Sequence, residues 1–434
     1  MRNFLTELSE RFQENRDFFK EPFMLGNNKV YLIGLNSIVD LLKTKEAIVE
    51  FGENSVLEFT KTKDYEAAAT KAALEILEGK LIICSADNKG FTSFKAVRKQ
   101  LVRSVSNPVT ENTVMGSQDA FIEDMRTNLG IIREKLVAGD LVIRGFTFGK
   151  TQVKRVSVLY RKETADPKLV GKIIASLEKS KDKDINFVQD LNKVLDVGKF
   201  NLLSHYHIVE MPTETVSSLN NGRVALFMEG FPFAVIIPHL FIDMFAHIND
   251  LNHSFITMNV VRLIRIAGAL TTLTLPGLYV ALVSVNPEAL KIELALSIAK
   301  SRIGVPYPAF VEIFIMLLIL ELIQEAIIRL PKTIGPTITM VGGIIIGQAI
   351  VQARLVSNIL IIIISATVIA NSTVTGAQNM YTLRVLKYVV MLIAAVYGIL
   401  GIMMALVFIC GYLSSKSTFG IPYVSGIKGG AKNG

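Results

Sequence analysis

Charged side chains are distributed very unevenly along this chain, and that distribution limits what the chain can fold into. Residues 1–223 carry 63 acidic and basic side chains, whereas residues 224–413 carry only 18. A mean hydropathy of +0.43 is too high for an ordinary soluble globule and excludes a disordered chain. The sequence therefore predicts an α/β cytoplasmic region of two small subdomains, followed by an all-α membrane domain.

The positive charge is not concentrated on one segment. The formal net charge of +8 is divided as +3, +2 and +3 over residues 1–223, 224–413 and 414–434, which gives little support to nucleic-acid binding. Cys84 lies in the charged half and Cys410 in an apolar run, so no disulfide is expected and a reduced, cytoplasmic environment fits. The charged N-terminus has no apolar core of signal-peptide length.

A membrane crossing requires about 20 apolar residues in a helix. Four stretches qualify as full crossings: Leu263–Val285, Pro308–Leu330, Leu355–Ala370 and Leu383–Leu413. Two further apolar stretches, 224–246 with its two prolines and the glycine-rich 338–352, are predicted to be re-entrant or interfacial segments.

Orientation follows the basic residues that flank the crossings. With four crossings one side receives Arg262, Arg265, Arg329, Lys332, Lys416, Lys428 and Lys432. Both termini are therefore predicted to be cytoplasmic, and the uncharged loop 371–382 is predicted to lie on the far side. The loop 286–307 disagrees because it is basic but would lie outside, and we interpret it as an amphipathic helix on the membrane surface.

The second crossing carries ionisable residues, which are costly inside a bilayer. Glu321, Glu325 and Arg329 recur at i, i+4 and i+8, and Glu325 precedes Arg329 in the order that favours an ion pair. Glu312 lies on the opposite face. These residues fit a water path or a gating element, but they also fit simple pairing with a neighbouring helix or with headgroups.

The segment 338–352 contains the strongest pattern of the membrane half. In a helix, one narrow stripe would carry Val341, Ile345, Gln348 and Gln352. Gly343 and Gly347 form GxxxG on the other side, the pattern that lets helices pack closely. The stripe resembles a pore lining in which the apolar level gates by dewetting and the amides replace ion hydration. The alternative is a stripe that only contacts another helix.

The charged half reads as two α/β subdomains. Buried strands are expected at 31–35 and 81–87, a helix at 65–78, a second helix at 119–136 capped near Ser117, and a hairpin of two strands around GKTQ. Asp166 and Pro167 start another helix, and a last helix is expected at 185–197. The predicted organisation is a helix at 1–28, subdomains at 29–103 and 118–215 with a linker at 104–117, a membrane domain at 216–413 and a basic tail at 414–434.

Motifs of known enzyme chemistry are absent from the sequence. It has no Walker loop, no GxGxxG after a strand, no GxSxG and no CxxC, so neither an enzyme nor a cofactor is predicted. His239, Asp243 and His247 have a spacing that could hold a metal on a helix, but bare spacing is weak and no metal is predicted. Arg126 and Arg133, seven apart on a predicted helix, could bind an anion or a partner, although a solvated face is the default.

Several longer segments resemble the A subunits of spore germination receptors. The resemblance covers residues 29–412 and is carried by VMGSQDAFIEDMRTNLGIIREKL (114–136), NNGRVALFMEGFPFAVIIP (220–238), LPGLYVALVSV (275–285), SRIGVPYPAFVE (301–312) and ELIQEAIIRLPKTIGPTITMVGGIIIGQAIVQARLVS (321–357). Asn286 and Pro287 stand where a histidine is usual. A divergent A subunit and the related stage V sporulation paralogue both fit.

The resemblance implies a multi-pass subunit of a nutrient receptor in the inner membrane of a bacterial spore. Its implied partners are a transporter-like, germinant-sensing B subunit and a C-subunit lipoprotein. It also implies a homo-oligomer, expected to be a pentamer, that passes monovalent cations to start germination, with 335–352 at the pore. The alternatives are a membrane-anchored scaffold without its own pore, and an ion-coupled transporter using Glu312 and Glu321.

Overall fold

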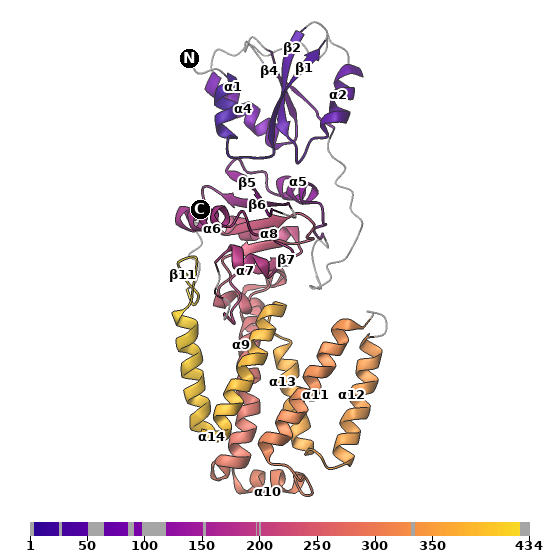
Figure 1. The fold of residues 1–434 in the computed structure, drawn as a ribbon, viewed down its shortest axis with the longest axis vertical. Helices are drawn as coiled ribbons and strands as arrows, with labels where there is room; N and C mark the ends of the chain where they lie inside the picture. Colours follow the sequence, from indigo (N-terminus) through magenta and orange to yellow (C-terminus); the bar gives the residue numbers. More distant parts are fainter. Residues whose placement is uncertain are drawn as a thin grey trace. The chain divides into compact units, whose positions relative to one another are not determined.

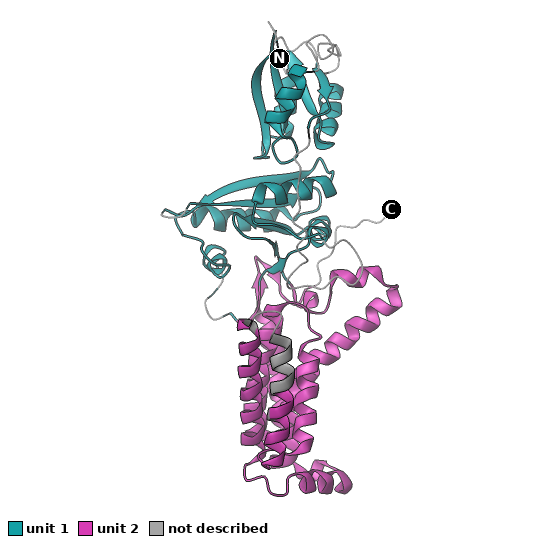
Figure 2. Ribbon diagram, turned by 90° about the vertical axis from the view of Figure 1, so that its right-hand side faces the viewer, with its two compact units in different colours: residues 1–201, 205–239, 427–434 teal, residues 202–204, 240–426 magenta. Residues whose placement is uncertain are grey.

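The computed structural model describes residues 4–25, 28–50, 65–85, 91–97, 119–150, 153–196, 198, 201–330 and 335–425. The predicted linker 104–117, Ser117, and Lys332 fall outside these residues. The chain divides into two compact units, coloured separately in Figure 2. Unit 1 contains residues 1–201, 205–239 and 427–434, and unit 2 contains residues 202–204 and 240–426.

Unit 1 begins with a four-stranded antiparallel sheet in the order β1-β2-β3-β4. Its elements are α1 (Phe4–Arg11), β1 (Phe18–Leu25), β2 (Asn28–Leu35), α2 (Leu41–Glu50), α4 (Tyr65–Leu77), β3 (Leu81–Ser85) and β4 (Phe91–Phe94). Successive side chains of a strand point to opposite faces, so Ile33 and Leu35 pack with α1 and α4 while Leu32 packs with Ile48 of α2. The strands expected at 31–35 and 81–87 and the helix expected at 65–78 correspond to β2, β3 and α4, and residues 86–87 lie outside the described residues. The predicted N-terminal helix ends at Arg11, because residues 18–25 form β1 instead.

The second part of unit 1 is a five-stranded antiparallel sheet in the order β5-β6-β8-β9-β7. Its elements are α5 (Met125–Lys135), β5 (Leu141–Phe148), β6 (Lys154–Arg161), α6 (Pro167–Lys179), α7 (Asp190–Val194), β7 (His207–Val209), α8 (Pro212–Asn220), β8 (Val224–Met228) and β9 (Ala234–Ile237). The β5–β6 hairpin and the start of α6 after Asp166 agree with the sequence. Asp124 caps α5, which starts later than predicted.

The hydropathy of segment 224–246 predicts a re-entrant or interfacial segment, and this prediction is wrong. Val224–Met228 and Ala234–Ile237 are fully buried strands in the middle of the second sheet. A strand that is covered on both faces is apolar at every position, and hydropathy alone cannot separate it from a lipid-facing helix. The helical unit therefore begins near Leu240.

A buried ion pair connects the first residues of the chain to the second sheet. Arg133, only 1% exposed, lies 3.3 Å from the Asp17 carboxylate and donates to the side-chain oxygen of Asn15 at 3.1 Å. Asn15 in turn accepts the amide N–H of Ile143 on β5 at 2.9 Å. A charge buried this deeply needs such partners, so Arg133 is a structural residue and does not lie on a solvated face.

Unit 2 is helical, and Figure 1 shows its long helices side by side. Its elements are the short turns η1 (Phe241–Met244) and η2 (Ile248–Asn252), α9 (Phe255–Val280), the π turn η3 (Ala281–Val285), η4 (Pro287–Ala289), α10 (Ile292–Ser301), α11 (Ala309–Arg329), α12 (Gly335–Gln352), α13 (Asn358–Asn371), α14 (Ala377–Ser415), and the two-residue strands β10 (Ser417–Thr418) and β11 (Ile421–Pro422). Among the described residues, two helical stretches, Phe255–Val285 and Ala377–Ser415, are long and apolar enough to cross a membrane.

The predicted crossing Leu383–Leu413 is two helices rather than one. Gly398 has φ 63° and ψ −140°, which breaks α14 and turns the chain back on itself (Figure 1). Val390 and Ala394 before the break pack against Ile402 and Ala405 after it. At 1.5 Å per residue the two halves are about 30 Å and about 25 Å long, which approaches the thickness of a bilayer core.

The loop after α13 lies at the end of unit 2 where α9 begins, which corrects its expected position on the far side. The Thr375 hydroxyl donates to the Met244 carbonyl at 2.7 Å, just before α9. At the other end of α13, the Ser357 hydroxyl lies 3.2 Å from that of Tyr279, near the end of α9. The loop changes sides because 335–352 forms one continuous helix, α12, which carries the chain along the bundle one additional time.

Candidate functional site

The stripe predicted on 338–352 lies on an edge helix of unit 2. Ile345 is 60% exposed, and Gln348 and Gln352 are also exposed. The Val341 side chain lies outside the described residues. Within one chain α12 packs mainly against α11, with Ile350 and Val351 anchoring its second half to the helical core. The stripe is therefore accessible to water, lipid or another protein.

The two glycines of the GxxxG pattern face open space within the described part of this chain. A Cβ atom added at Gly343 or at Gly347 would have no heavy atom within 4 Å. The close packing that GxxxG favours is therefore not made by one copy, and it remains a prediction for contacts with another chain.

Glu312 is the most deeply buried carboxylate of unit 2, with 0% exposure. Its oxygens lie 3.3 Å from Nε of Arg302 and accept the amide N–H of Ser357 at 2.6 Å and the Tyr279 hydroxyl at 3.3 Å. The loop after α10 and the helices α9, α11 and α13 are thus joined at one end of the bundle. Sequence reasoning found Glu312 but missed its partners, because Arg302 was assigned to a surface helix.

Glu321 pairs with two basic residues of α14. Its carboxylate lies 3.0 Å from Nζ of Lys387 and 3.4 Å from Nη1 of Arg384. Glu325 and Arg329 form the ion pair expected from their spacing, at 2.8 Å, with 57% and 76% of their side chains exposed. The acidic residues of α11 therefore do not gather at one point, and Glu312 and Glu321 tie α11 to different neighbours.

The break in α14 is stabilised by Asn286. Its side-chain oxygen accepts the amide N–H of Ile399 at 3.0 Å, which is one of the backbone groups that the break leaves without a helical partner. A Cβ at position 398 would overlap that same oxygen, and the positive φ there also favours glycine. The asparagine noted at 286 therefore has a structural role at the turn of the α14 hairpin.

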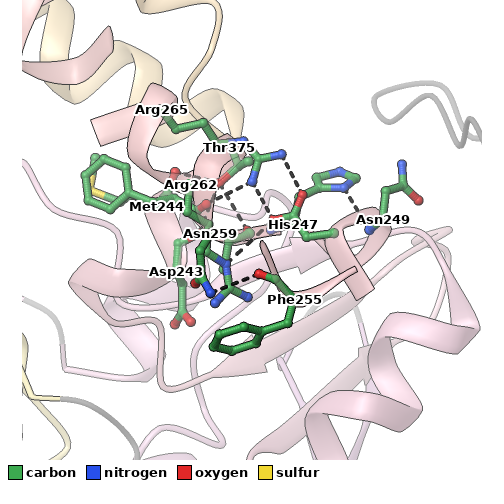
Figure 3. Close-up of polar contacts among 12 residues, drawn as sticks. Asp243, Met244, His247, Asn249, Phe255, Asn259, Arg262, Arg265 and Thr375 are labelled. Carbon is green, nitrogen blue, oxygen red and sulfur yellow. Dashed lines mark hydrogen bonds and ion pairs between the residues drawn. The ribbon is translucent and has the colours of Figure 1, made fainter. Parts of the chain in front are cut away.

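A second polar cluster lies at the start of unit 2 and is shown in Figure 3. Asp250 of η2 is 3% exposed and receives both terminal nitrogens of Arg265 from α9, at 2.5 and 2.8 Å. Thr375, from the loop after α13, donates to the carbonyl of Met244. The segment that leads into α9 is thereby fixed both to α9 and to the loop after α13, and we call it the junction.

His239, Asp243 and His247 do not lie on one helix, because this part of the chain forms the short turns η1 and η2. Asp243 accepts the amide N–H of Leu240 at 2.8 Å, and His247 accepts that of Asn249 at 3.1 Å. Both side chains cap short turns, so the i, i+4, i+8 geometry does not exist. No group of three possible metal ligands occurs among the residues that the structure describes.

Replacing Arg265 with methionine is expected to raise the pH at which this junction opens. Burial raises the pKa of Asp250, but Arg265 and the His247 amide lower it by more, so the pKa lies below its usual value. A carboxylate with a depressed folded pKa contributes stability above its unfolded pKa of about 4, and that contribution is lost as the pH falls through the folded value. Without Arg265 the loss begins at a higher pH.

Limited proteolysis with an acid-active protease, read at residues 240–254 over a descending pH series, measures this opening. Arg262→Met is the control, because the Arg262 Nε lies 3.9 Å from Asp250 and contributes less. Equal shifts for the two variants would contradict the assigned role of Arg265.

The fold defines a class of protein: an α/β region of two antiparallel sheets joined to a domain of long apolar helices. Many of these helices carry exposed apolar faces, such as Val396, Leu400, Val407 and Phe408 on α14, at 66–70% exposure. Surfaces of this kind require lipid or another chain, and the class is that of a membrane protein. Residues 6–430 match the family described as Bacillus/Clostridium GerA spore germination protein, and the chain belongs to this family.

Individual relatives agree with this assignment. The chain is 32% identical to spore germination protein B1 of Bacillus subtilis (strain 168), over 98% of this chain and 91% of that protein. It is 30% identical to spore germination protein A1 of the same organism, over 96% and 88%, and 33% identical to GerLA of Bacillus cereus, over 75% and 66%. A crystal structure of the N-terminal domain of the A subunit of the Bacillus megaterium spore germinant receptor GerK3 is similar at 19% identity, with a TM-score of 0.36, over 55% of this chain and 94% of that one.

Proposed function

We propose that this chain is the channel-forming A subunit of a nutrient germinant receptor in the inner membrane of a bacterial spore. Several copies, expected to be five, assemble into a ring and release monovalent cations when germination is triggered. One observation carries the proposal: α12 leaves both its glycine face and its stripe of Ile345, Gln348 and Gln352 without a partner within the described part of one chain.

The glycine face and the amide stripe have different chemistry, and a ring of several copies would give each of them a suitable environment. The glycine face lets a helix of another copy approach closely, which is the packing that GxxxG favours in membranes. The amides of the stripe would be costly against lipid tails but are suited to a water-filled path. A helix between a neighbouring copy and a central axis meets both requirements at once.

The orientation of the helices supports both termini in the cytoplasm. Arg262 and Arg265 at the start of α9, Arg329 at the end of α11 and Lys416 at the end of α14 lie at one end of the bundle, because α11 runs antiparallel to α9 and α14 returns at Gly398. Basic residues concentrate on the cytoplasmic side. The proposed partners are a transporter-like B subunit that senses the germinant and a C-subunit lipoprotein.

Replacing Gly347 with leucine is expected to disrupt assembly without unfolding the chain. The position has open space in one copy, so the added side chain meets nothing there, but it would separate two helices packed across the glycines. Native mass spectrometry of the purified protein should show a shift from oligomer to monomer, while the helix content measured by circular dichroism stays unchanged.

Gly411→Leu is the matched control, because Gly411 also lies in a helix and also has open space around it. It should leave the oligomer intact. If Gly347→Leu assembles as well as the unchanged protein, or if Gly411→Leu disrupts assembly equally, the glycine face of α12 is not the contact between copies.

A further inference from the structure

Unit 1 contains a cleft of about 360 Å³ between its two sheets that the proposed channel function does not use. Its walls come from the turn before β1, the turn after β2, the first turns of α5, and strands β5 and β6. Three arginines from three of these elements line it: Arg16, Arg126 and Arg155. The volume is in the range of pockets that hold small molecules.

The arginines of this cleft have no ion-pair partner among the residues that the structure describes, although Asp124 lies close enough to Arg126 for their charges to interact. All three arginines are exposed. Asp17 also lines the cleft, but its carboxylate is occupied by Arg133 and by the Ser37 hydroxyl, which donates at 2.7 Å. The cleft therefore presents three guanidinium groups and no free carboxylate in its lining.

Each of the three arginines is carried by a different element of unit 1. The amide N–H of Arg16 donates to the Ile143 carbonyl at 3.0 Å, and its side chain lies across Gly145, where a Cβ atom would overlap it. Arg126 lies in the first turn of α5, after the capping residue Asp124. Arg155 and the buried Ser157 project from the same strand, β6. The three cations are thus carried by separate elements of one folded unit.

An adjacent depression also contains basic residues, but one of them is paired with a carboxylate. The depression is larger, about 860 Å³, and Arg144 there lies 3.4 Å from the carboxylate of Glu14. Burial raises the pKa of Glu14, yet Lys162 and Arg144 lower it below its usual value, so this carboxylate is charged and compensates them. Arg16 lines both depressions, whereas Arg126 and Arg155 line only the smaller cleft, whose described lining has no charge-compensating pair like that of Glu14 and Arg144.

We propose that the smaller cleft binds the phosphate group of a small soluble molecule. Guanidinium groups present planar, paired N–H donors that match phosphate oxygens, and charge-assisted hydrogen bonds of this type are the strong ones. Several donors approaching from different directions suit a tetrahedral phosphate better than a planar carboxylate. Met125 and Leu129 form an apolar wall beside the arginines, which suits the carbon part of the ligand.

Isothermal titration of the purified full-length protein in phosphatidylcholine nanodiscs, with inorganic phosphate and then pyrophosphate as probes at constant ionic strength, tests the proposal. Saturable binding is expected. Arg126→Gln and Arg155→Gln should each weaken it by about tenfold, and Arg126→Lys, which keeps the charge but loses the paired donors, should give an intermediate loss. No saturable binding of either probe up to about 10 mM would overturn the proposal.

Arg11→Gln is the control, since Arg11 is an exposed arginine of α1 outside the cleft. An equal loss of binding in this variant would show a general charge effect and would also overturn the proposal. Repeating the titration in phosphatidylglycerol nanodiscs separates the two sources of phosphate. Unchanged affinity there supports a soluble ligand, whereas competition by the anionic lipid would assign the site to a headgroup and refute a soluble one.

Discussion

Liposomes that contain the Ile345→Ser variant are expected to leak monovalent cations about tenfold faster at rest than liposomes that contain the unchanged protein. Ile345 is the described apolar residue of the stripe on α12, and 60% of it is exposed in one copy. In a ring, its side chains would form a narrow apolar level that excludes water. A serine hydroxyl holds water there, and a tenfold change requires only about 1.4 kcal/mol.

Ile362→Ser on α13 is the matched control, because it removes the same side chain from a position that is 68% exposed on another helix. It should leave the resting leak unchanged. Flux is measured with an entrapped cation-sensitive dye, and native mass spectrometry confirms that each variant assembles. An Ile345→Ser protein that assembles normally but leaks no faster than Ile362→Ser would remove Ile345 from the proposed pore.

Glu312→Gln is expected to give the largest loss of stability in unit 2. The substitution keeps the shape of the side chain but leaves Arg302, whose side chain is 21% exposed, without its counter-charge. Breaking a buried ion pair by removing one partner costs about 3–5 kcal/mol, and the partial exposure of Arg302 places the expected loss near about 3 kcal/mol. The amide of Ser357 also loses a charged acceptor at 2.6 Å.

The exposed pair Glu325–Arg329 on the same helix provides a comparison for the loss of stability in Glu312→Gln. Glu325→Gln removes a salt bridge of similar length whose members are mostly in contact with solvent or lipid, and such pairs contribute about 0–1 kcal/mol. Thermal unfolding in one detergent should show a clear decrease for Glu312→Gln and almost none for Glu325→Gln. Equal decreases would mean that the network around Glu312 does not hold the helices together.

Hydropathy and local patterns predicted the division into an α/β half and a helical half, and they found β2, β3, α4 and the β5–β6 hairpin. These features depend on short-range signals: continuous apolar runs, turn residues and Asp-Pro at a helix start. The same short-range signals failed at Val224–Met228, because a strand buried on both sides has the same apolar composition as a membrane segment.

The break at Gly398 was missed although a signal for it was present. The apolar run 383–413 is much longer than the roughly 20 residues of one crossing, and a glycine lies at its middle. Its length is better explained by two helices and a turn, which is what the structure contains. The capping of that turn by Asn286 could not be predicted, because Asn286 and Ile399, whose amide it accepts, are 113 positions apart in the sequence.

The polar residues of unit 2 could also be identified from the sequence, but their distant partners could not. Ionisable residues inside apolar helices are conspicuous in a sequence, so Glu312 and Glu321 were found, and the local i, i+4 spacing was sufficient for Glu325 and Arg329. The partners of Glu312 come from positions 279, 302 and 357. No local pattern specifies such contacts, since they depend on how the helices pack.

The position of α12 in the assembled protein, determined by electron cryomicroscopy in lipid nanodiscs, tests the central claim most directly. We expect several copies around one axis, with Ile345 and Gln348 facing that axis and Gly343 and Gly347 packed against the next copy. A single copy per nanodisc, or a ring in which α12 faces the lipid, would contradict the proposed channel.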